Sequence, residues 1–141
     1  MRLSSPPTGF GCTSWNNLRK ALVGGWDADG APLYVCLANY GGGQIPGKTR
    51  SNWNYCDVGY GGAEHAVSTY LLVGLNFQGA GTGTPYVAGT DSTGAQLGIC
   101  VMASYSNSFQ PGKYLISSGG CNIGYGGAEI SQAGGFTVLT F

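Results

Sequence analysis

The stretch Tyr60-Gly61-Gly62-Ala63-Glu64 occurs a second time, residue for residue, as Tyr125-Gly126-Gly127-Ala128-Glu129. The four residues before it also repeat, because Cys56-Asp57-Val58-Gly59 corresponds to Cys121-Asn122-Ile123-Gly124. Five identical residues in the same order are not expected to recur by chance in a chain of 141 residues. Similarity at a fixed spacing is typical of proteins built from structural repeats. We therefore predict two copies of one unit.

The two copies cover nearly the whole chain. Residues 23–33 correspond to residues 87–97, and each copy ends in an apolar run, at residues 70–73 and 136–139. The offset between the copies is 64 at Asp27, 65 from Lys48 through Glu64 and 66 at the end. We assign the single-residue insertions behind these steps to loops. The predicted organisation is an N-terminal arm at residues 1–17, a first repeat at 18–78 and a second at 79–141.

The residue patterns predict an all-β fold. No segment shows a convincing apolar period of 3.6 residues, and short apolar runs are bounded by glycine, aspartate and proline. A repeat of roughly 60 residues buries little core alone, so we expect both repeats to contribute antiparallel strands to one core. The expected elements are strands at residues 20–26, 31–38 and 70–75, a tight turn at Asp29-Gly30, a glycine-rich loop at 39–44 and a type II turn at Pro46-Gly47.

Composition argues against several partners. The net charge is zero and only six residues are basic, which argues against nucleic acid as a partner. No apolar run reaches the roughly 18–20 residues of a membrane span. The first residues lack the apolar core of a signal peptide, so we expect a cytoplasmic or non-classically secreted protein. His65 is the single histidine and no Cys-x-x-Cys pair exists, so we expect neither a metal site nor a cofactor.

The cysteines allow two interpretations. Cys36 corresponds to Cys100 and Cys56 to Cys121, whereas Cys12 has no counterpart. The four matched residues could form two disulfides, one in each repeat or crosswise. They could also be small buried thiols on strands. The odd count and the missing signal peptide favour the buried thiols.

Charged residues are retained at equivalent positions of the two repeats. Only 12 residues are charged, and six of them form matched pairs: Asp27 with Asp91, Lys48 with Lys113, and Glu64 with Glu129. One explanation is a buried or half-buried ion pair that pins loops together. The other is a polar pocket in which a carboxylate accepts from sugar hydroxyls and an ammonium donates to them. For the two glutamates we favour the supporting, structural role.

The motif order resembles the DM-nine repeat family. Gly-x-Asp-x-x-Gly-x-x-Leu-Tyr-Val, Pro-Gly-Lys and Tyr-Gly-Gly-x-Glu appear in that order, followed by an aromatic-led terminal strand, from Lys20 to Phe141. This family includes mannose-recognising lectins of innate defence and the lectin modules of some pore-forming toxins. The resemblance implies an all-β domain whose two repeats exchange strands, often assembled as a homodimer.

The resemblance also implies sugar-binding residues. The family's aspartate and lysine correspond to Asp27 and Lys48 here, with Asp91 and Lys113 as second-repeat equivalents, and Gly47 and Gly112 support the lysines. Family lectins can carry an acidic residue four positions before the lysine, where this chain has Gln44 and Phe109. Gln44 could bond a hydroxyl, whereas Phe109 could only stack. Trp26 could stack on the apolar face of a pyranose, or it could belong to the core.

We therefore expect a metal-independent lectin that binds mannose-containing glycans, and cross-linking of such surfaces would make it an agglutinin. The alternatives are a structural or protein-interaction module and the lectin module of a pore-forming toxin system. A glycosidase would need a pair of carboxylates such as Asp27 and Glu64. That pair occurs twice, with a lysine between its members. Catalysis by a serine or cysteine nucleophile needs a histidine, and His65 has no counterpart in the second repeat. We therefore predict that the chain is not an enzyme.

Overall fold

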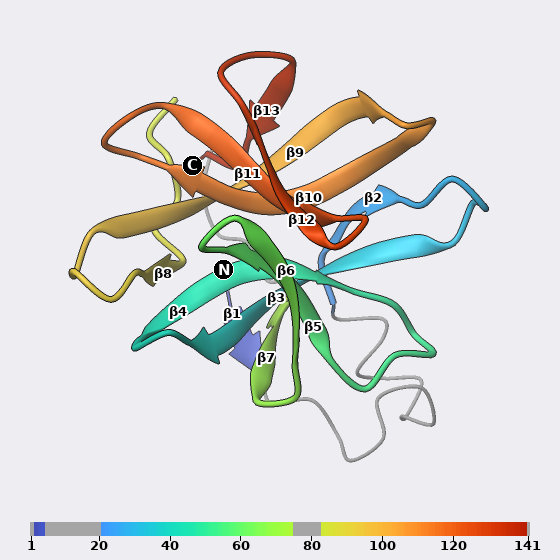
Figure 1. Cartoon of the computed structure of the whole chain (residues 1–141), viewed down its shortest axis with the longest axis horizontal. Helices are drawn as coiled ribbons and strands as arrows, with labels where there is room; N and C mark the ends of the chain where they lie inside the picture. The colour runs from blue at the N-terminus through green and yellow to red at the C-terminus, as the bar shows by residue number, and fades with distance from the viewer. Residues whose placement is uncertain (1, 5–20, 75–82, 141) are drawn as a thin grey trace.

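The computed structural model describes residues 2–4, 21–74 and 83–140 (Figure 1). Over these residues the chain is built of β-strands and turns, without a helix, so the predicted all-β class is confirmed. Apart from Arg2–Ser4, the predicted arm lies outside the described residues. The strands are β1 Arg2–Ser4, β2 Val23–Trp26, β3 Pro32–Tyr40, β4 Gly43–Thr49, β5 Cys56–Tyr60, β6 Ala63–Val67, β7 Tyr70–Gly74, β8 Gly89–Thr90, β9 Gln96–Tyr105, β10 Ser108–Leu115, β11 Gly120–Tyr125, β12 Ala128–Gln132 and β13 Phe136–Val138.

Each repeat contributes the same series of strands. β2 to β7 of the first repeat correspond in order to β8 to β13 of the second. In each copy a long hairpin, β3–β4 or β9–β10, pairs antiparallel, and its first strand also pairs with the last strand of the same copy. A shorter hairpin, β5–β6 or β11–β12, completes the copy. The sequence repeat is therefore also a repeat in topology.

The two copies exchange strand pairings, as expected. β2 pairs with β3 of its own repeat and, through Trp26 and Phe109, with β10 of the other. Likewise β8 pairs with β9 and, through Thr90 and Gln44, with β4. Figure 1 shows β2 beside β10 on one side of the molecule and β8 beside β4 on the other. β6 also pairs directly with β12, through Ala63 and Ala128, so the short hairpins of the two repeats are joined.

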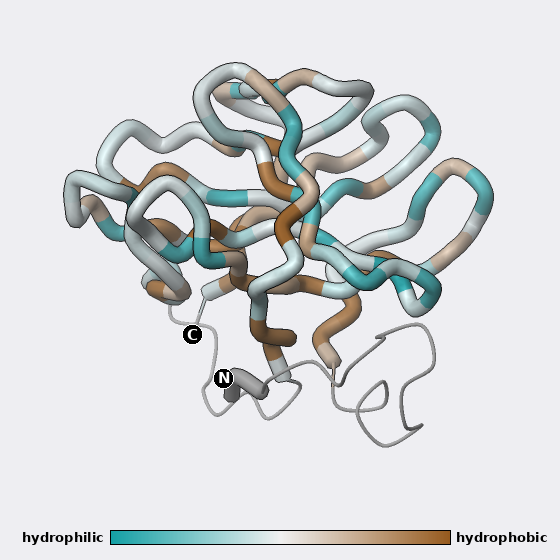
Figure 2. Tube along the Cα trace, turned by 60° about the horizontal axis from the view of Figure 1, so that its bottom comes forward, coloured by the Kyte–Doolittle hydropathy of each residue, from teal (hydrophilic) through white to brown (hydrophobic). Residues whose placement is uncertain are grey.

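Apolar side chains from both repeats are buried between the strands. On β3, Leu33, Val35 and Leu37 are buried on one face and Cys36 and Ala38 on the other, as predicted for a central strand. One group of packed residues combines Val35 and Val73 of the first repeat with Ile99 of the second. Figure 2 shows the hydrophobic segments running through the body of the molecule, with hydrophilic ones at several hairpins. A larger group combines first-repeat residues with Leu97 of the second repeat, whereas another contains second-repeat residues alone.

The matched cysteines form one disulfide in each repeat. Cys36 is bonded to Cys56 and Cys100 to Cys121, and all four side chains are fully buried. The preference for free thiols was therefore wrong. The strand arrangement brings both pairs of Cα atoms to 6.0 Å, within bonding range. Cys12 lies outside the described residues.

The glycine and proline signals mark close strand crossings as well as turns. The predicted loop at residues 39–44 is a tight hairpin turn at Gly41-Gly42, with strands on both sides. The type II turn predicted at Pro46-Gly47 is wrong, because both residues lie inside β4 and pair with β3. A Cβ at Gly47 would lie 2.2 Å from the carbonyl oxygen of Asp57, and one at Gly112 equally near that of Asn122. These glycines allow β5 and β11 to approach.

One of the repeat insertions lies in a strand. Ala38 pairs with Ile45 in the first repeat, and Met102 pairs with Gln110 in the second. The offset therefore changes from 64 to 65 within the β9–β10 hairpin, where the register shifts and Ser104 has a φ of 54°. The prediction that these insertions lie in loops is wrong for this step, because a β-bulge accommodates an extra residue without ending a strand.

The crossing at Gly47 gives a stability prediction. Gly47→Ala places a methyl group against the Asp57 carbonyl, which belongs to the backbone and cannot rotate away. We expect the free energy of unfolding to fall by about 2–3 kcal/mol. The matched control is Gly134→Ala, since a Cβ at Gly134 meets nothing within 4 Å. Urea titration of both variants measures the effect, and equal stability of the two would contradict the proposed role of Gly47.

Candidate functional site

The repeated pentapeptides bind each other. Glu64 Oε1 accepts a hydrogen bond of 2.8 Å from the Gly127 amide, and Glu129 Oε1 accepts one of 3.0 Å from the Gly62 amide. Backbone bonds run between the same segments, from the Glu64 amide to the Gly127 carbonyl and from the Glu129 amide to the Gly62 carbonyl. Both glutamates therefore join the two repeats.

The two lysines also reach across to the other repeat. Lys48 Nζ lies 5.1 Å from the ring centroid of Tyr125, and Lys113 Nζ lies 5.2 Å from that of Tyr60. A cation over an aromatic face is attracted by the ring quadrupole. Each lysine thus contacts the tyrosine that begins the other copy of the pentapeptide. This crossed arrangement explains why the same charges occur twice in the sequence.

Lys48 lies at the centre of a closed polar cluster. Its ammonium donates to Gln110 Oε1 and, at 2.7 Å, to the Gly124 carbonyl. Gln110 Nε2 in turn donates to Asp27 Oδ1 at 3.1 Å. The structure therefore brings the predicted pair Asp27 and Lys48 together through a glutamine of the other repeat. Lys48 is only 3% exposed and Gln110 0%, so a sugar has no direct access to this ammonium.

Asp27 has a second partner at the edge of this cluster. Arg50 donates from Nη1 to Asp27 Oδ2 at 3.1 Å and from Nη2 to Asp29 Oδ2 at 2.9 Å. The Asp27 side chain keeps 22% of its surface exposed. Arg50 fixes the hairpin turn between β2 and β3 to the end of β4. Asp27 is thus the only member of the predicted Asp27–Lys48 pair with a solvent-facing edge.

The second-repeat cluster differs from the first. Lys113 forms an ion pair of 2.9 Å with Glu129 Oε2. Asp91 Oδ1 accepts from the Thr93 hydroxyl and amide and from the Ala95 amide, at 2.6, 2.9 and 3.0 Å. These bonds, led by the Thr93 hydroxyl, lower the pKa of Asp91 below its ordinary value. Apolar Ile45 occupies the position equivalent to Gln110, so no amide side chain at that position links Asp91 to Lys113.

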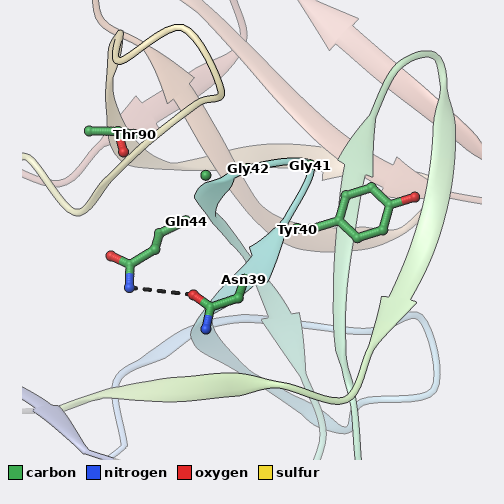
Figure 3. Close-up of a pocket in the computed structure, with 7 residues that line it drawn as sticks. Asn39, Tyr40, Gly41, Gly42, Gln44 and Thr90 are labelled. Carbon is green, nitrogen blue, oxygen red and sulfur yellow. Dashed lines mark hydrogen bonds between the residues drawn. The ribbon is translucent and has the colours of Figure 1, made fainter.

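Gln44 lines a hollow where the β3–β4 hairpin of the first repeat meets β8 of the second. This glycine-rich hollow, of about 520 Å³, lies at the tip of the β3–β4 hairpin beside β8 (Figure 3). Gln44 Nε2 donates to Asn39 Oδ1 at 3.5 Å, and the Tyr40 ring points away from both amides toward His65, to which its hydroxyl is bonded at 3.0 Å. No lining residue is charged. The residues that line the hollow are Asn39, Tyr40, Gly41, Gly42, Gly43, Gln44 and Thr90.

Trp26 lies on the surface, where β2 of the first repeat pairs with β10 of the second. It is 53% exposed and pairs directly with Phe109, which is 44% exposed. The next residues along each strand, Asp27 and Gln110, are hydrogen-bonded to each other, with Gln110 fully buried. Alternation along a strand therefore directs the two rings to solvent. Trp26 is therefore not a core residue.

Asp57 is a buried acid beside the crossed glutamates. Burial and a hydrogen bond with Glu64 raise the pKa of Asp57 from 3.8 to about 9. Burial opposes ionisation of Glu64 as well, but the bonds from Asp57 and from the Gly127 amide lower the pKa of Glu64. Asp57 therefore carries the proton that the pair shares. Its counterpart Asn122 donates from Nδ2 to Glu129 Oε2 at 3.0 Å. At this position the first repeat therefore has an acid donor to glutamate and the second repeat has an amide donor.

Several site residues were not predicted from the sequence. Gln110, Arg50, Asn39 and Thr90 were not candidates, because none has an identical counterpart in the other repeat and the family resemblance does not point to them. For Gln110 and Thr90 the missing signal was the strand exchange, which brings them beside residues of the first repeat. Residues that occur in both repeats join the two copies, whereas residues that differ between the repeats distinguish their surfaces.

The described residues show neither a metal cluster nor a membrane helix. No group of three or more His, Cys, Asp or Glu side chains gathers within residues 2–4, 21–74 and 83–140. In the same part of the chain, no helix has the length and apolar character needed to cross a bilayer.

Comparisons with known proteins agree with this fold. Residues 12–67 match the family model of the DM9 repeat, whereas no curated protein matches the chain. Among solved structures, the nematode sperm cell motility protein MFP2B is similar, with a TM-score of 0.65 at 18% sequence identity over 99% of this chain. The match spans 44% of the length of that protein, and at this identity it shows the fold alone. The structural similarity supports the β fold described above.

The Asp57 acid gives a pH-dependence prediction. Between about pH 4 and 9 the folded protein keeps a proton on Asp57 that the unfolded chain releases, so the free energy of unfolding falls as the pH rises through this window. Asp57→Asn removes that titration and leaves a donor to Glu64. We expect the variant's advantage over the wild type to grow from about pH 4 to 9 and then to level off. Urea unfolding across this pH range measures it.

The reciprocal variant serves as a control. Asn122→Asp introduces the same acid beside Glu129, so its free energy of unfolding should fall with rising pH more steeply than that of the wild type. Parallel curves for wild type and Asp57→Asn would show that Asp57 does not hold a proton in the folded protein.

Proposed function

We propose that this chain, which carries a DM9 repeat at residues 12–67, is a non-catalytic carbohydrate-binding module that takes a neutral hexose of mannose type in the glycine-rich hollow. One observation carries the proposal. The hollow of about 520 Å³ presents uncharged hydrogen-bonding groups from both repeats and no charged side chain. Its volume lies within the roughly 300–1,000 Å³ of small-molecule sites.

The groups in the hollow suit the hydroxyls of a sugar. The side-chain amides of Asn39 and Gln44 both donate and accept, and the Thr90 hydroxyl does the same. Gly41 and Gly42 have φ values of 61° and 81° and leave their backbone open to close approach. Neighbouring hydroxyls of a pyranose need donors and acceptors in alternation, which these groups supply. The mannose type follows from the resemblance to the DM-nine lectins.

One of the predicted charged residues, Asp91, lies beside this hollow. The Asp91 backbone lies where a Cβ at Gly43 would be, with its Cα at 2.9 Å from that position, so the Asp91 turn forms one wall beside the hairpin. Asp91 is partly exposed, so we place it at the rim of the hollow. Lys48 and Lys113 act from beneath by fixing the two repeats. Neither lysine contacts the sugar in this binding mode, because both are buried.

Weak, metal-independent binding is expected. A small polar site of this kind supplies on the order of 4–6 kcal/mol, or roughly millimolar to tens of micromolar dissociation constants. Chelation with EDTA should leave binding unchanged, because the hollow offers no carboxylate as a ligand. A homodimer would present at least two such hollows and would bind a multivalent glycan surface more tightly than one hollow alone.

The hollow gives a binding prediction. The double variant Gln44→Ala, Thr90→Ala removes two hydrogen-bonding side chains and should weaken the binding of methyl α-mannopyranoside at least tenfold. Because both residues are exposed, the fold should be unaffected. Titration followed by ¹⁵N NMR measures the dissociation constant and should move the amide signals of residues 39–44 and 90.

The control is Phe109→Ala, which changes the position equivalent to Gln44 in the other repeat. This variant should bind the mannoside as the wild type does. Unchanged binding by the double variant, with shifts away from the β3–β4 hairpin, would place the sugar elsewhere.

A further inference from the structure

The residues around the glycine-rich hollow have counterparts on the other side of the molecule, and these differ in chemistry. Trp26 is equivalent to Thr90, and Phe109 to Gln44, because the two strand-exchange pairings join these residues in the same way. At the hairpin tips, Gly41-Gly42 of the first repeat is equivalent to Ser106-Asn107 of the second. The pseudo-symmetry therefore places two aromatic rings where the hollow has a hydroxyl and an amide.

The aromatic rings face solvent together. Trp26 and Phe109 are two of the four large hydrophobic residues exposed in the described part of the chain. Residues that pair directly across an antiparallel ladder have neighbouring side chains on the same face. A Cβ at Gly25 would lie 1.9 Å from the Phe109 carbonyl oxygen, so this glycine lets the two strands approach. The pair is held in position by the backbone on both sides.

A polar hairpin borders the rings. Ser104, Ser106 and Asn107 have φ values of 54°, 49° and 58° and are the non-glycine residues with positive φ in the described part of the chain. All three side chains are exposed. Left-handed conformations are costly for residues other than glycine and are concentrated at functional sites. Here they present two hydroxyls and an amide beside the Trp26–Phe109 pair, in place of the glycines that open the hollow.

We propose that Trp26, Phe109 and the Ser104–Asn107 hairpin form a second sugar subsite, with a specificity different from that of the hollow. The ligand class is a β-linked hexose chain of gluco configuration. Equatorial hydroxyls leave the C–H groups of such a ring on two flat apolar faces, which stack on exposed aromatic rings. The hydroxyls then point sideways, toward the hairpin. An axial hydroxyl, as at C2 of mannose, interrupts one of these faces.

This inference rests on the proposed function in so far as both assign sugar binding to the chain, but it concerns a different surface. The two surfaces would then select sugars differently. The hollow selects by hydrogen bonds, and the Trp26–Phe109 subsite selects by contact with apolar ring faces. A single chain would then bind two kinds of sugar at once.

The test uses two sugars and two reporters in one ¹⁵N-labelled protein. Cellotriose should move the Trp26 indole signal and the amides of residues 104–109, whereas methyl α-mannopyranoside should move the amides of residues 39–44 and 90. Trp26→Ala should weaken cellotriose binding at least tenfold and leave the mannoside unaffected. Thr90→Ala, the matched variant, should do the reverse. Both residues are exposed, and the spectra of the free variants report whether each one folds.

The outcomes separate the two proposals. If the mannoside moves no signal while cellotriose moves the Trp26 indole, the mannose assignment fails and the second subsite stands. If cellotriose moves only the hollow signals, or moves none, the subsite is overturned and the aromatic pair is left as a surface for a protein partner. A Trp26→Ala variant that binds cellotriose as the wild type does would also overturn it.

Discussion

The crossed contact between the two Tyr-Gly-Gly-Ala-Glu segments is the constraint on which the rest of the structure depends. Each glutamate accepts from a glycine amide of the other segment, and each lysine lies over the tyrosine that begins it. Buried charges are costly unless they are paired and hydrogen-bonded. Lys113 pairs with Glu129 of its own repeat, but Lys48 and both glutamates also have hydrogen-bond partners in the other repeat, and these bonds hold the two copies together.

That constraint also determines which residues must be small. A Cβ at Gly59 would lie 2.9 Å from Glu129 Cγ, and one at Gly124 would lie 3.0 Å from Glu64 Cγ. The glutamates therefore reach their amide donors by crossing over glycines of the other repeat. In the same region Asp57 and Asn122 occupy one structural position with different chemistry. Both provide a donor to a glutamate, but only the acid responds to pH.

The sequence predicted the repeat and the β class, because identical motifs and apolar alternation reflect the backbone directly. The exchange of strands was implied by the resemblance to the DM-nine repeat family. The sequence predicted less of the site, because the retained residues Lys48 and Lys113 prove to join the repeats rather than to face solvent. Pro46-Gly47 was read as a turn because that pair is common in turns, whereas here the glycine permits a strand crossing. The disulfides could not be decided from the sequence, since composition gives no distance between the thiols.

The residues that face solvent near each exchange point are those that differ between the copies. Trp26 stands opposite Phe109, and Thr90 stands opposite Gln44. A symmetrical assembly of two identical single-repeat chains would carry the same residues at both of these points, and any substitution would alter both. Fusion of the two copies into one polypeptide removes that restriction. Duplication followed by fusion thus gives a route by which one ancestral surface acquires two specificities while the interior that unites the halves stays under common selection.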